Sequence, residues 1–278
     1  MTYLSEALET ARLIQDEYRR AEVLTSLAQI DTAYFSEALE TARLIQDEYS
    51  RAFVLTNLAQ IDTTYFSEVL ETARLIQSKD KRALVLMSLI QVNGADFFAL
   101  LEAACSIQDE GKRAEVLTSL IQVNGADFSA LLEAACSIQD EGKRAEVLTS
   151  LIQVNGADFS ALLEVVCSIQ DEYRRAEVLT SLARQASSEF LLIVGRAIFD
   201  LNHKPTCAEA LSHYFPRLYL STLPYSDWQT YLHLLAHRQR SDLMQDLVTL
   251  YPAILHLGGE AAMRGVVDAM REVYSQWK

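Results

Sequence analysis

The sequence is poor in turn-forming residues and has no long apolar run. Only 9 glycines and 4 prolines occur among 278 residues, which argues against a sandwich or barrel of many short strands. No stretch of eighteen apolar residues is present, and the N-terminus MTYLSEALET lacks the basic start and apolar core of a signal peptide. We therefore expect a cytoplasmic protein that does not enter a membrane.

Basic residues and catalytic motifs are also scarce. The 24 lysines and arginines are outnumbered by 38 acidic residues, and the net charge is −14. This argues against a nucleic-acid partner, because binding to phosphates needs clustered cations. No G-x-x-x-x-G-K-S/T, G-x-G-x-x-G or G-x-S-x-G motif occurs. We expect neither an enzyme nor a bound cofactor.

What the sequence does contain is a tandem repeat. Residues 1–186 divide without gaps into six units of 31 residues. The fourth and fifth units, 94–124 and 125–155, differ only where Phe98 is replaced by Ser129. Long divergence would not leave two units so alike, so the duplication is recent, maintained by gene conversion, or designed.

The apolar residues within each unit follow a helical period. In the fifth unit a first stripe consists of Phe128, Leu131, Leu132, Ala135 and Ile138, and a second of Ala145, Leu148, Leu151 and Ile152. Their spacing is that of amphipathic helices, with Asp127 and Asp140 as expected N-caps. Each unit is therefore predicted to be a helical hairpin, and because one hairpin cannot bury both faces, the units should stack as a solenoid.

Residues 187–278 differ in composition, since they hold all the prolines, histidines and tryptophans. We expect a degenerate seventh repeat here, with a second helix over Thr206–Tyr214, and then a C-terminal helical cap over an otherwise open solenoid end. Further helices are predicted over Ser226–Arg238, Ser241–Leu257 and Glu260–Trp277. Pro252 should kink or divide the second of these.

Two sets of residues resemble metal or redox sites, and we interpret both as structural. Cys105, Cys136 and Cys167 recur once per repeat, too far apart for disulfides, and are expected to be buried or half-buried thiols. His233 and His237 are four residues apart on one helix, but no third ligand is indicated and Leu234 stands where a zinc protease has glutamate. We expect no metal site.

One arginine holds the same position in every unit, at Arg20, Arg51, Arg82, Arg113, Arg144 and Arg175. The residue four positions earlier is an aspartate in five units and Ser78 in the third. A carboxylate at that spacing can pair with the arginine, or the arginine can reach an acid of the next unit. Either contact is structural, although a role in ligand binding stays open.

The second helix of the repeat carries a family resemblance. The stretch D-E-G-K-R-A-E-V-L-T-S-L at Asp140–Leu151 is similar to the D-x-x-x-R-x-x-A/V-x-x-L signature of HEAT-like repeats of the phycobilisome-lyase type. Ile14–Ala28 and Ile45–Ala59 look like repeats found C-terminal to NTPase domains in cyanobacterial proteins of the NACHT/STAND class. The resemblance covers about two thirds of the chain. It implies an all-α, right-handed αα-hairpin solenoid and a sensor or scaffold role beside an NTPase.

The units differ most on the second helix, where a ligand would bind in a HEAT-like array. One position is Glu22, Phe53, Leu84, Glu115, Glu146 and Glu177, and Met87 replaces a threonine three residues after Leu84. Phe53, Leu84 and Met87 are either core residues or an apolar anchor for a partner. Glu115, Glu146 and Glu177 would then attract basic groups of that partner.

Two functions from different classes follow. The favoured hypothesis is a monomeric scaffold that binds a protein or peptide with a basic surface. The alternative is a structural or self-assembling repeat protein, consensus-like or designed, in which near-identical units provide length. Light scattering over a range of concentrations separates the two.

Overall fold

The structure, a computed structural model, describes residues 2–123, 125–154, 156–215, 225–235 and 239–276. Within these residues all regular secondary structure is helical, with α1–α17 and two short 3-10 turns and no strand. No helix in the described part is both long and apolar enough to span a bilayer. Successive helices pack on their neighbours, which confirms the prediction of an all-α chain built like a helical solenoid.

Each of the first six repeats contains two α-helices. The first is called the A helix of the repeat and the second the B helix. The A helices are α1 (Thr2–Arg12), α3 (Phe35–Leu44), α5 (Phe66–Leu75), α7 (Phe97–Cys105), α9 (Phe128–Cys136) and α11 (Phe159–Cys167). The B helices are α2 (Glu17–Ile30), α4 (Glu48–Ala59), α6 (Lys79–Ile90), α8 (Glu110–Ile121), α10 (Glu141–Leu151) and α12 (Glu172–Gln185). The 3-10 turns Thr32–Tyr34 and Thr63–Tyr65 precede α3 and α5.

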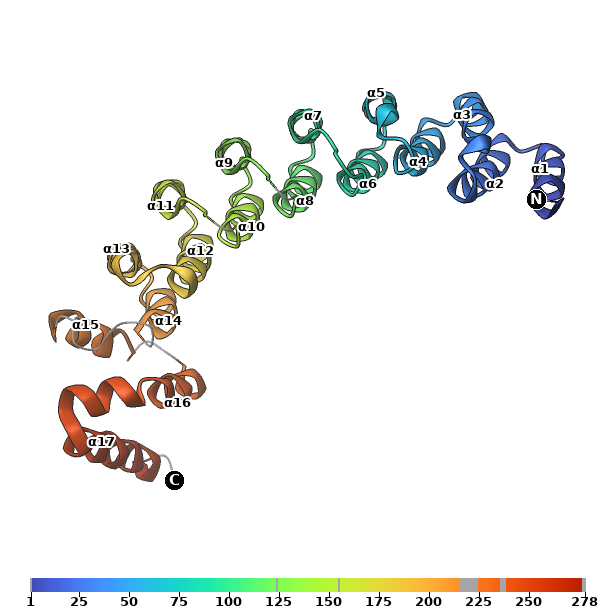
Figure 1. Cartoon of the computed structure of the whole chain (residues 1–278). Helices are drawn as coiled ribbons and strands as arrows, with labels where there is room; N and C mark the ends of the chain where they lie inside the picture. The colour runs from blue at the N-terminus through green and yellow to red at the C-terminus, as the bar shows by residue number, and fades with distance from the viewer. Residues whose placement is uncertain (1, 124, 155, 216–224, 236–238, 277–278) are drawn as a thin grey trace. The chain divides into compact units, whose positions relative to one another are not determined.

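Apart from the repeats, the contacts between helices divide the chain into two compact parts, Met1–Val147 and Leu148–Lys278. Within Met1–Val147, Figure 1 shows the A helices α3, α5, α7 and α9 in one row and the B helices α2, α4, α6 and α8 in a second row. The B helices α2, α4 and α6 each pack on the next B helix, and α2, α4, α6 and α8 each pack on the A helix of their own repeat. The predicted change of domain after residue 186 stays a prediction.

The B helices begin at side-chain caps, as expected from sequence. The carboxylate of Asp16 accepts a hydrogen bond from the Arg19 N–H at 2.8 Å, and that of Asp140 from the Lys143 N–H at 2.9 Å. Such a cap satisfies a backbone donor that has no partner within the helix and contributes about 1 kcal/mol. Asp127 caps α9 in the same way through the Ala130 N–H, at 2.9 Å.

The core forms where the helical stripes of the two rows meet. In the fifth repeat Leu131, Ala135 and Ile138 are fully buried as predicted, whereas Phe128 and Leu132 are only half-buried. The second stripe is buried throughout, with Ala145, Leu148, Leu151 and Ile152 at 2% exposure or less. The two stripes thus define the inner faces of the A and B helices.

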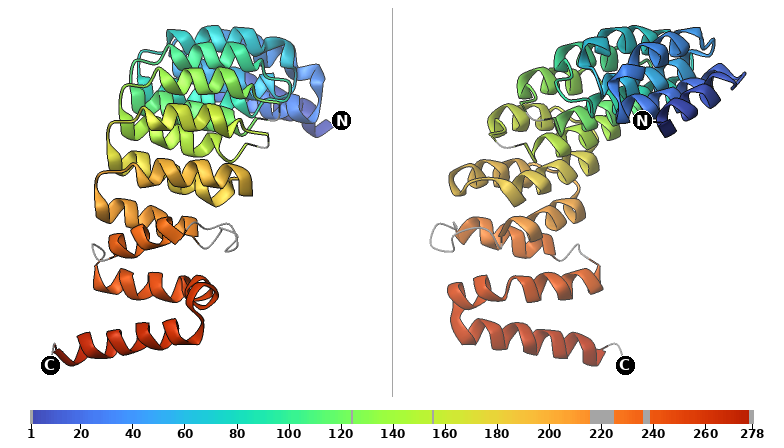
Figure 2. Two further views of the ribbon diagram at one scale, coloured as in Figure 1. Left: turned by 90° about the vertical axis from the view of Figure 1, so that its left-hand side faces the viewer. Right: turned by 45° about the vertical axis from the view of Figure 1, so that its right-hand side comes forward.

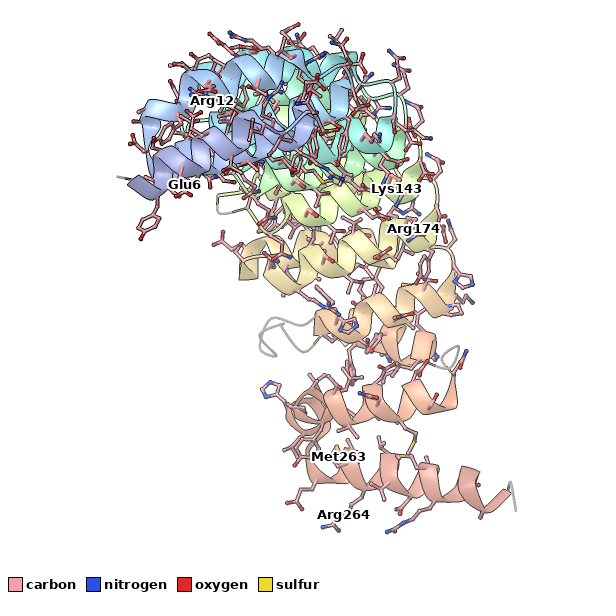
Figure 3. All side chains as sticks on the ribbon, turned by 90° about the vertical axis from the view of Figure 1, so that its right-hand side faces the viewer. Glu6, Arg12, Lys143, Arg174, Met263 and Arg264 are labelled. Atoms are coloured by element: carbon pink, nitrogen blue, oxygen red, sulfur yellow. The ribbon has the colours of Figure 1, made fainter. Side chains whose placement is uncertain are left out.

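Ion pairs join consecutive A helices in the first units. The Arg12 guanidinium donates from Nε and Nη2 to the two carboxylate oxygens of Glu37, both at 2.8 Å, and Arg43 binds Glu68 in the same bidentate manner. Figure 3 labels Arg12. These pairs hold the pKa of the Glu37 and Glu68 carboxyls below their ordinary range. They fix the register between neighbouring A helices, because bidentate pairing restricts both distance and orientation.

A different contact joins later units, at the turn between the A and B helices. The carboxylate of Glu110, the first residue of α8, accepts hydrogen bonds from the backbone N–H groups of Gln139 at 2.9 Å and Asp140 at 2.6 Å. Within Leu148–Lys278, Glu172 accepts in the same way from Asn202 and His203. The B helix of one unit therefore satisfies the backbone of the next unit's turn. Sequence analysis assigned these glutamates no such role.

This contact predicts an acid-sensitive contribution to stability. Backbone N–H donors hold the pKa of Glu110 below its ordinary value of 4.5, so the ionised form stabilises the fold above pH 4.5 and this stabilisation is lost as the pH falls through the lowered pKa. We expect Glu110→Gln to be less stable than the parent at pH 7, with a difference that shrinks on acidification. Urea unfolding at several pH values measures this.

A control for this experiment is Glu133→Gln. Glu133 is exposed, and its side chain makes no ion pair with the described residues. An equal loss of stability in both variants at pH 7, or a difference for Glu110→Gln that does not change with pH, would contradict the proposed role of the carboxylate.

The C-terminal helices belong to Leu148–Lys278. They are α13 (Ser188–Phe199), α14 (Lys204–Tyr214), α15 (Tyr225–Leu235), α16 (Arg240–Thr249) and α17 (Tyr251–Gln276). Figure 2 shows them, coloured from yellow-orange to red, as successive layers. α13 and α14 lie where the degenerate seventh repeat was expected, and α14 packs on the B helix α12.

Aromatic rings join α14 to α15. Phe215 stacks on Tyr231 with ring centroids 4.2 Å apart and meets Trp228 edge-on at 5.8 Å, and all three are buried. Pro252 lies in the first turn of α17, where its missing N–H costs nothing. The helix predicted over Ser241–Leu257 is therefore divided before Pro252 into α16 and α17. Within α17 the backbone breaks at Gly259, with φ +61°, as expected for the double glycine.

Candidate binding surface on the B helices

Phe53 and Leu84 lie on the solvent side of adjacent B helices. Phe53 of α4 is 37% exposed and Leu84 of α6 is 50% exposed, whereas their neighbours Val54 and Val85 are buried. Met87 is half-buried on the same helix as Leu84. Their exposure therefore favours the alternative in which Phe53 and Leu84 are not core residues. Phe53, Leu84 and Met87 together are called the apolar patch.

Aromatic and cationic groups flank this patch. The Tyr49 ring lies 6.5 Å from the Phe53 ring, centroid to centroid. The ammonium group of Lys81, on the next B helix, lies over the Tyr49 ring at 4.9 Å. A cation against an aromatic face contributes about 0.5–1 kcal/mol at an exposed site, so the edge of the apolar patch is ordered before any partner binds.

The three predicted glutamates are exposed, but each is paired with a cation on its own helix. Lys112 binds Glu115 at 2.9 Å, Lys143 binds Glu146 at 2.9 Å, and Arg174 binds Glu177 at 3.2 Å. Figure 3 labels Lys143 and Arg174. The glutamates predicted to attract basic groups are therefore already ion-paired, because the cation three residues earlier lies on the same helical face. Surface pairs of this kind contribute only about 0–1 kcal/mol, so a basic partner can displace the lysine.

The repeated arginine makes a contact that sequence analysis did not identify. Arg51 Nη1 donates to the backbone oxygen of Ile45 at 2.8 Å, and Arg175 Nη1 donates to Ile169 at 2.8 Å. The residue four positions earlier does not pair with it, because the aspartate there caps the helix. The arginine instead closes the turn between the A and B helices of its own unit, which makes it a structural residue.

The cysteines occupy two environments. Cys105, Cys136 and Cys167 are exposed at the ends of A helices, so the prediction that they are buried or half-buried was wrong. They stand at the repeat position that Arg12, Arg43 and Arg74 hold in the first three repeats, where the side chain lies at the surface. Partial burial still raises the pKa of each thiol. Cys207 is buried, donates to the Ile198 backbone oxygen, and has a pKa raised by burial to about 11. All four are therefore thiols at neutral pH rather than reactive thiolates.

The histidine pair is only half described. His233 is an exposed residue of α15, and His237 lies outside the described residues. In the part of the chain that is described, no three histidine, cysteine or acidic side chains lie close enough together to hold a metal ion.

Within Met1–Val147 the candidate site is thus the exposed side of the B helices, with the apolar patch on α4 and α6 and the ion-paired Glu115 on α8 and Glu146 on α10. Glu177 on α12, which is paired with Arg174, belongs to Leu148–Lys278. Comparison with protein-family models, with curated proteins and with solved structures finds no match to this chain.

Proposed function

We propose that this protein is a non-enzymatic repeat scaffold that binds a protein or peptide on the exposed side of its B helices. The observation that carries the proposal is the exposure of Phe53 and Leu84, at a position where the other four B helices of the array have glutamate. Large apolar side chains within a polar surface are characteristic of interaction sites. Such anchors supply most of an interface's binding energy.

The acidic charge of the chain selects the partner. A net charge of −14 and the glutamates Glu115, Glu146 and Glu177 favour a partner with a basic surface. Long-range attraction mainly speeds association, while the apolar anchor slows dissociation. Nucleic acid is not the proposed partner, because its phosphates would be repelled.

The finer architecture and setting belong to the same proposal. We regard the array as a right-handed solenoid of 31-residue HEAT-like repeats of the phycobilisome-lyase type. Its role would be recognition or sensing for a bacterial STAND-type NTPase, in the cytoplasm and as a monomer. A self-assembling array would instead show an apparent molar mass, measured by light scattering, that rises with protein concentration.

The test is a binding experiment with a partner isolated by pull-down and confirmed with purified components. Phe53→Ala and Leu84→Ala should each raise Kd at least tenfold, because each removes an apolar anchor, and a tenfold change corresponds to about 1.4 kcal/mol. Calorimetry or surface plasmon resonance measures the change.

The matched control is Leu44→Ala, which truncates a leucine of the A helix α3 that is 57% exposed. The Kd of Leu44→Ala for the partner should stay within twofold of the value for the parent protein. A partner whose affinity is unaffected by Phe53→Ala and Leu84→Ala would contradict the assignment of the patch.

A further inference from the structure

A groove lies between α12 and α14, within Leu148–Lys278. It encloses a cavity of about 270 Å³ lined by Tyr173, Glu177 and Arg184 from α12 and by Thr206, Glu209 and His213 from α14. Small-molecule sites usually measure about 300–1,000 Å³. The cavity therefore suits individual side chains of a peptide rather than a whole cofactor.

The groove is open because a short side chain replaces a lysine. In three earlier B helices the third residue after the N-cap is a lysine that reaches the preceding B helix. Lys81 lies over the Tyr49 ring at 4.9 Å, Lys112 lies 3.4 Å from Asp80, and the Lys143 side chain lies beside Gly111. In α14 the corresponding residue is Thr206, which is too short to cover the residue opposite.

The residue left uncovered is Tyr173, which is 63% exposed. Its nearest cation is Arg174 of its own helix, 5.7 Å from the ring centroid and also paired with Glu177. The first B helices also lack the lysine, since Ser50 stands there, but Tyr18 bends back and its hydroxyl donates to Glu22 at 2.7 Å. No such hydrogen bond involves Tyr173 among the described residues. The groove thus presents an aromatic face at the position where three other B helices place a lysine against the preceding B helix.

The other end of the groove carries two residues found in no other unit. Arg184 stands where all five earlier B helices have glutamine, and His213 stands where they and α12 have serine or asparagine. Arg184 Nη2 is 3.4 Å from His213 Nδ1 and 3.3 Å from Nε2. Arg184 therefore directs its Nη2 group at the His213 ring, at nearly equal distances from the two ring nitrogens.

The contact with His213 uses Nη2 of Arg184, and no hydrogen bond within the described part of the chain involves its Nε or Nη1. Among the described residues no carboxylate lies within ion-pair distance of Arg184. With one Nη2 hydrogen directed at His213, one pair of guanidinium N–H groups remains that can bind a carboxylate in a bidentate manner. The repeated residues of the array have structural roles in packing one repeat on the next, whereas Arg184 departs from the repeat, and of the residues that the structure describes its side chain hydrogen-bonds with His213 alone.

We infer that the groove binds a linear peptide, with a lysine or arginine side chain against Tyr173 and Glu177 and a carboxylate on Arg184. The peptide's cation takes the place that Lys81 occupies over Tyr49. Tyr173 and Arg184 are separated by eleven residues of helix, about 16 Å at 1.5 Å per residue. An extended chain spans that distance in about five residues, so the basic and acidic groups stand at opposite ends of a pentapeptide. The inference rests on the proposed peptide-binding function.

The probe is a blocked pentapeptide with lysine and aspartate at its ends and three alanines between, in both orders. The peptide is titrated into the protein while the backbone amide signals are followed by NMR. Amide signals of α12 and α14 should shift with the peptide in one of the two residue orders. Replacing its lysine by glutamine or its aspartate by asparagine should weaken binding at least fivefold. Absence of shifts in α12 and α14 with both orders overturns the inference.

Two variants that restore the residue of other repeats test the geometry without disturbing the helices. Arg184→Gln and Thr206→Lys should each raise Kd at least tenfold, the first by removing the anion site and the second by filling the groove. The matched control Gln122→Arg adds an arginine at the same position of α8 and should leave Kd within twofold. Unchanged affinity in both Arg184→Gln and Thr206→Lys overturns the inference.

A charge exchange separates direct contact from an indirect effect. Arg184→Glu should no longer bind the lysine–aspartate peptide. It should bind the peptide in which lysine replaces aspartate at least fivefold more tightly than the parent protein does. Failure of that rescue counts against a direct contact. The proposed function is tested separately, through Phe53 and Leu84 of Met1–Val147, so a partner that depends on those residues but leaves this groove untouched contradicts only the present inference.

Discussion

Leu86→Ala should lower the free energy of unfolding by about 2–5 kcal/mol, the range for truncating a buried leucine. Leu86 is 1% exposed in α6, between the A and B rows of Met1–Val147. Its loss removes apolar surface from the core and leaves a cavity that rigid neighbouring helices fill only in part. Urea unfolding followed by circular dichroism measures the change.

Leu84→Ala is the matched control, because it is the same substitution two residues earlier in the same helix. Leu84 is 50% exposed, so its truncation should cost less than about 1 kcal/mol. Two equal losses would mean that the buried face of α6 is assigned incorrectly. The control also shows that loss of partner binding in Leu84→Ala does not come from unfolding.

Arg82→Met should destabilise the protein by about 2–3 kcal/mol, the contribution of hydrogen bonds to a charged group. Arg82 donates from Nε and Nη2 to the backbone oxygen of Ile76, at 3.0 and 2.7 Å. Methionine keeps much of the side-chain volume but leaves that oxygen at the turn without its donor. The midpoint of urea unfolding should fall accordingly.

Arg113→Met provides the contrast, since it changes the equivalent residue of the next unit. The buried Arg113 Nε has no hydrogen-bond partner, and the nearest acid, Glu110, lies 3.5 Å from Nη2. Removing a buried donor that is not satisfied should change stability by less than about 1 kcal/mol. A larger loss for Arg113→Met than for Arg82→Met would contradict this account of the repeated arginine.

Local features were predictable because they depend on residues close in sequence. The capping aspartates Asp127 and Asp140, the breaks at Pro252 and Gly259, and the buried stripe from Ala145 to Ile152 all follow from backbone geometry and a helical period. The half-buried state of Phe128 was not predictable, since a period identifies the inner face of a helix and not how completely its neighbours cover it.

The surface was predicted less well. Sequence analysis identified Glu115, Glu146 and Glu177 as a row, but overlooked that Lys112, Lys143 and Arg174 stand three residues earlier and bind them. That signal was present in the sequence, as was the replacement of glutamine by Arg184. The α12–α14 groove was not, because its opening depends on how far Thr206 and Tyr173 extend between two packed helices.

By itself the sequence determined the helical class, the hairpin unit and the start of each B helix, because these depend on periodicity and on hydrogen bonds within a few residues. Tertiary structure decided the partners of the charged groups. Glu37 binds Arg12 across repeats, Glu110 binds the next turn, and Arg51 binds the backbone oxygen of Ile45 instead of the aspartate four positions earlier. Such contacts join residues brought together only by stacking, where several donors and acceptors compete and geometry selects among them.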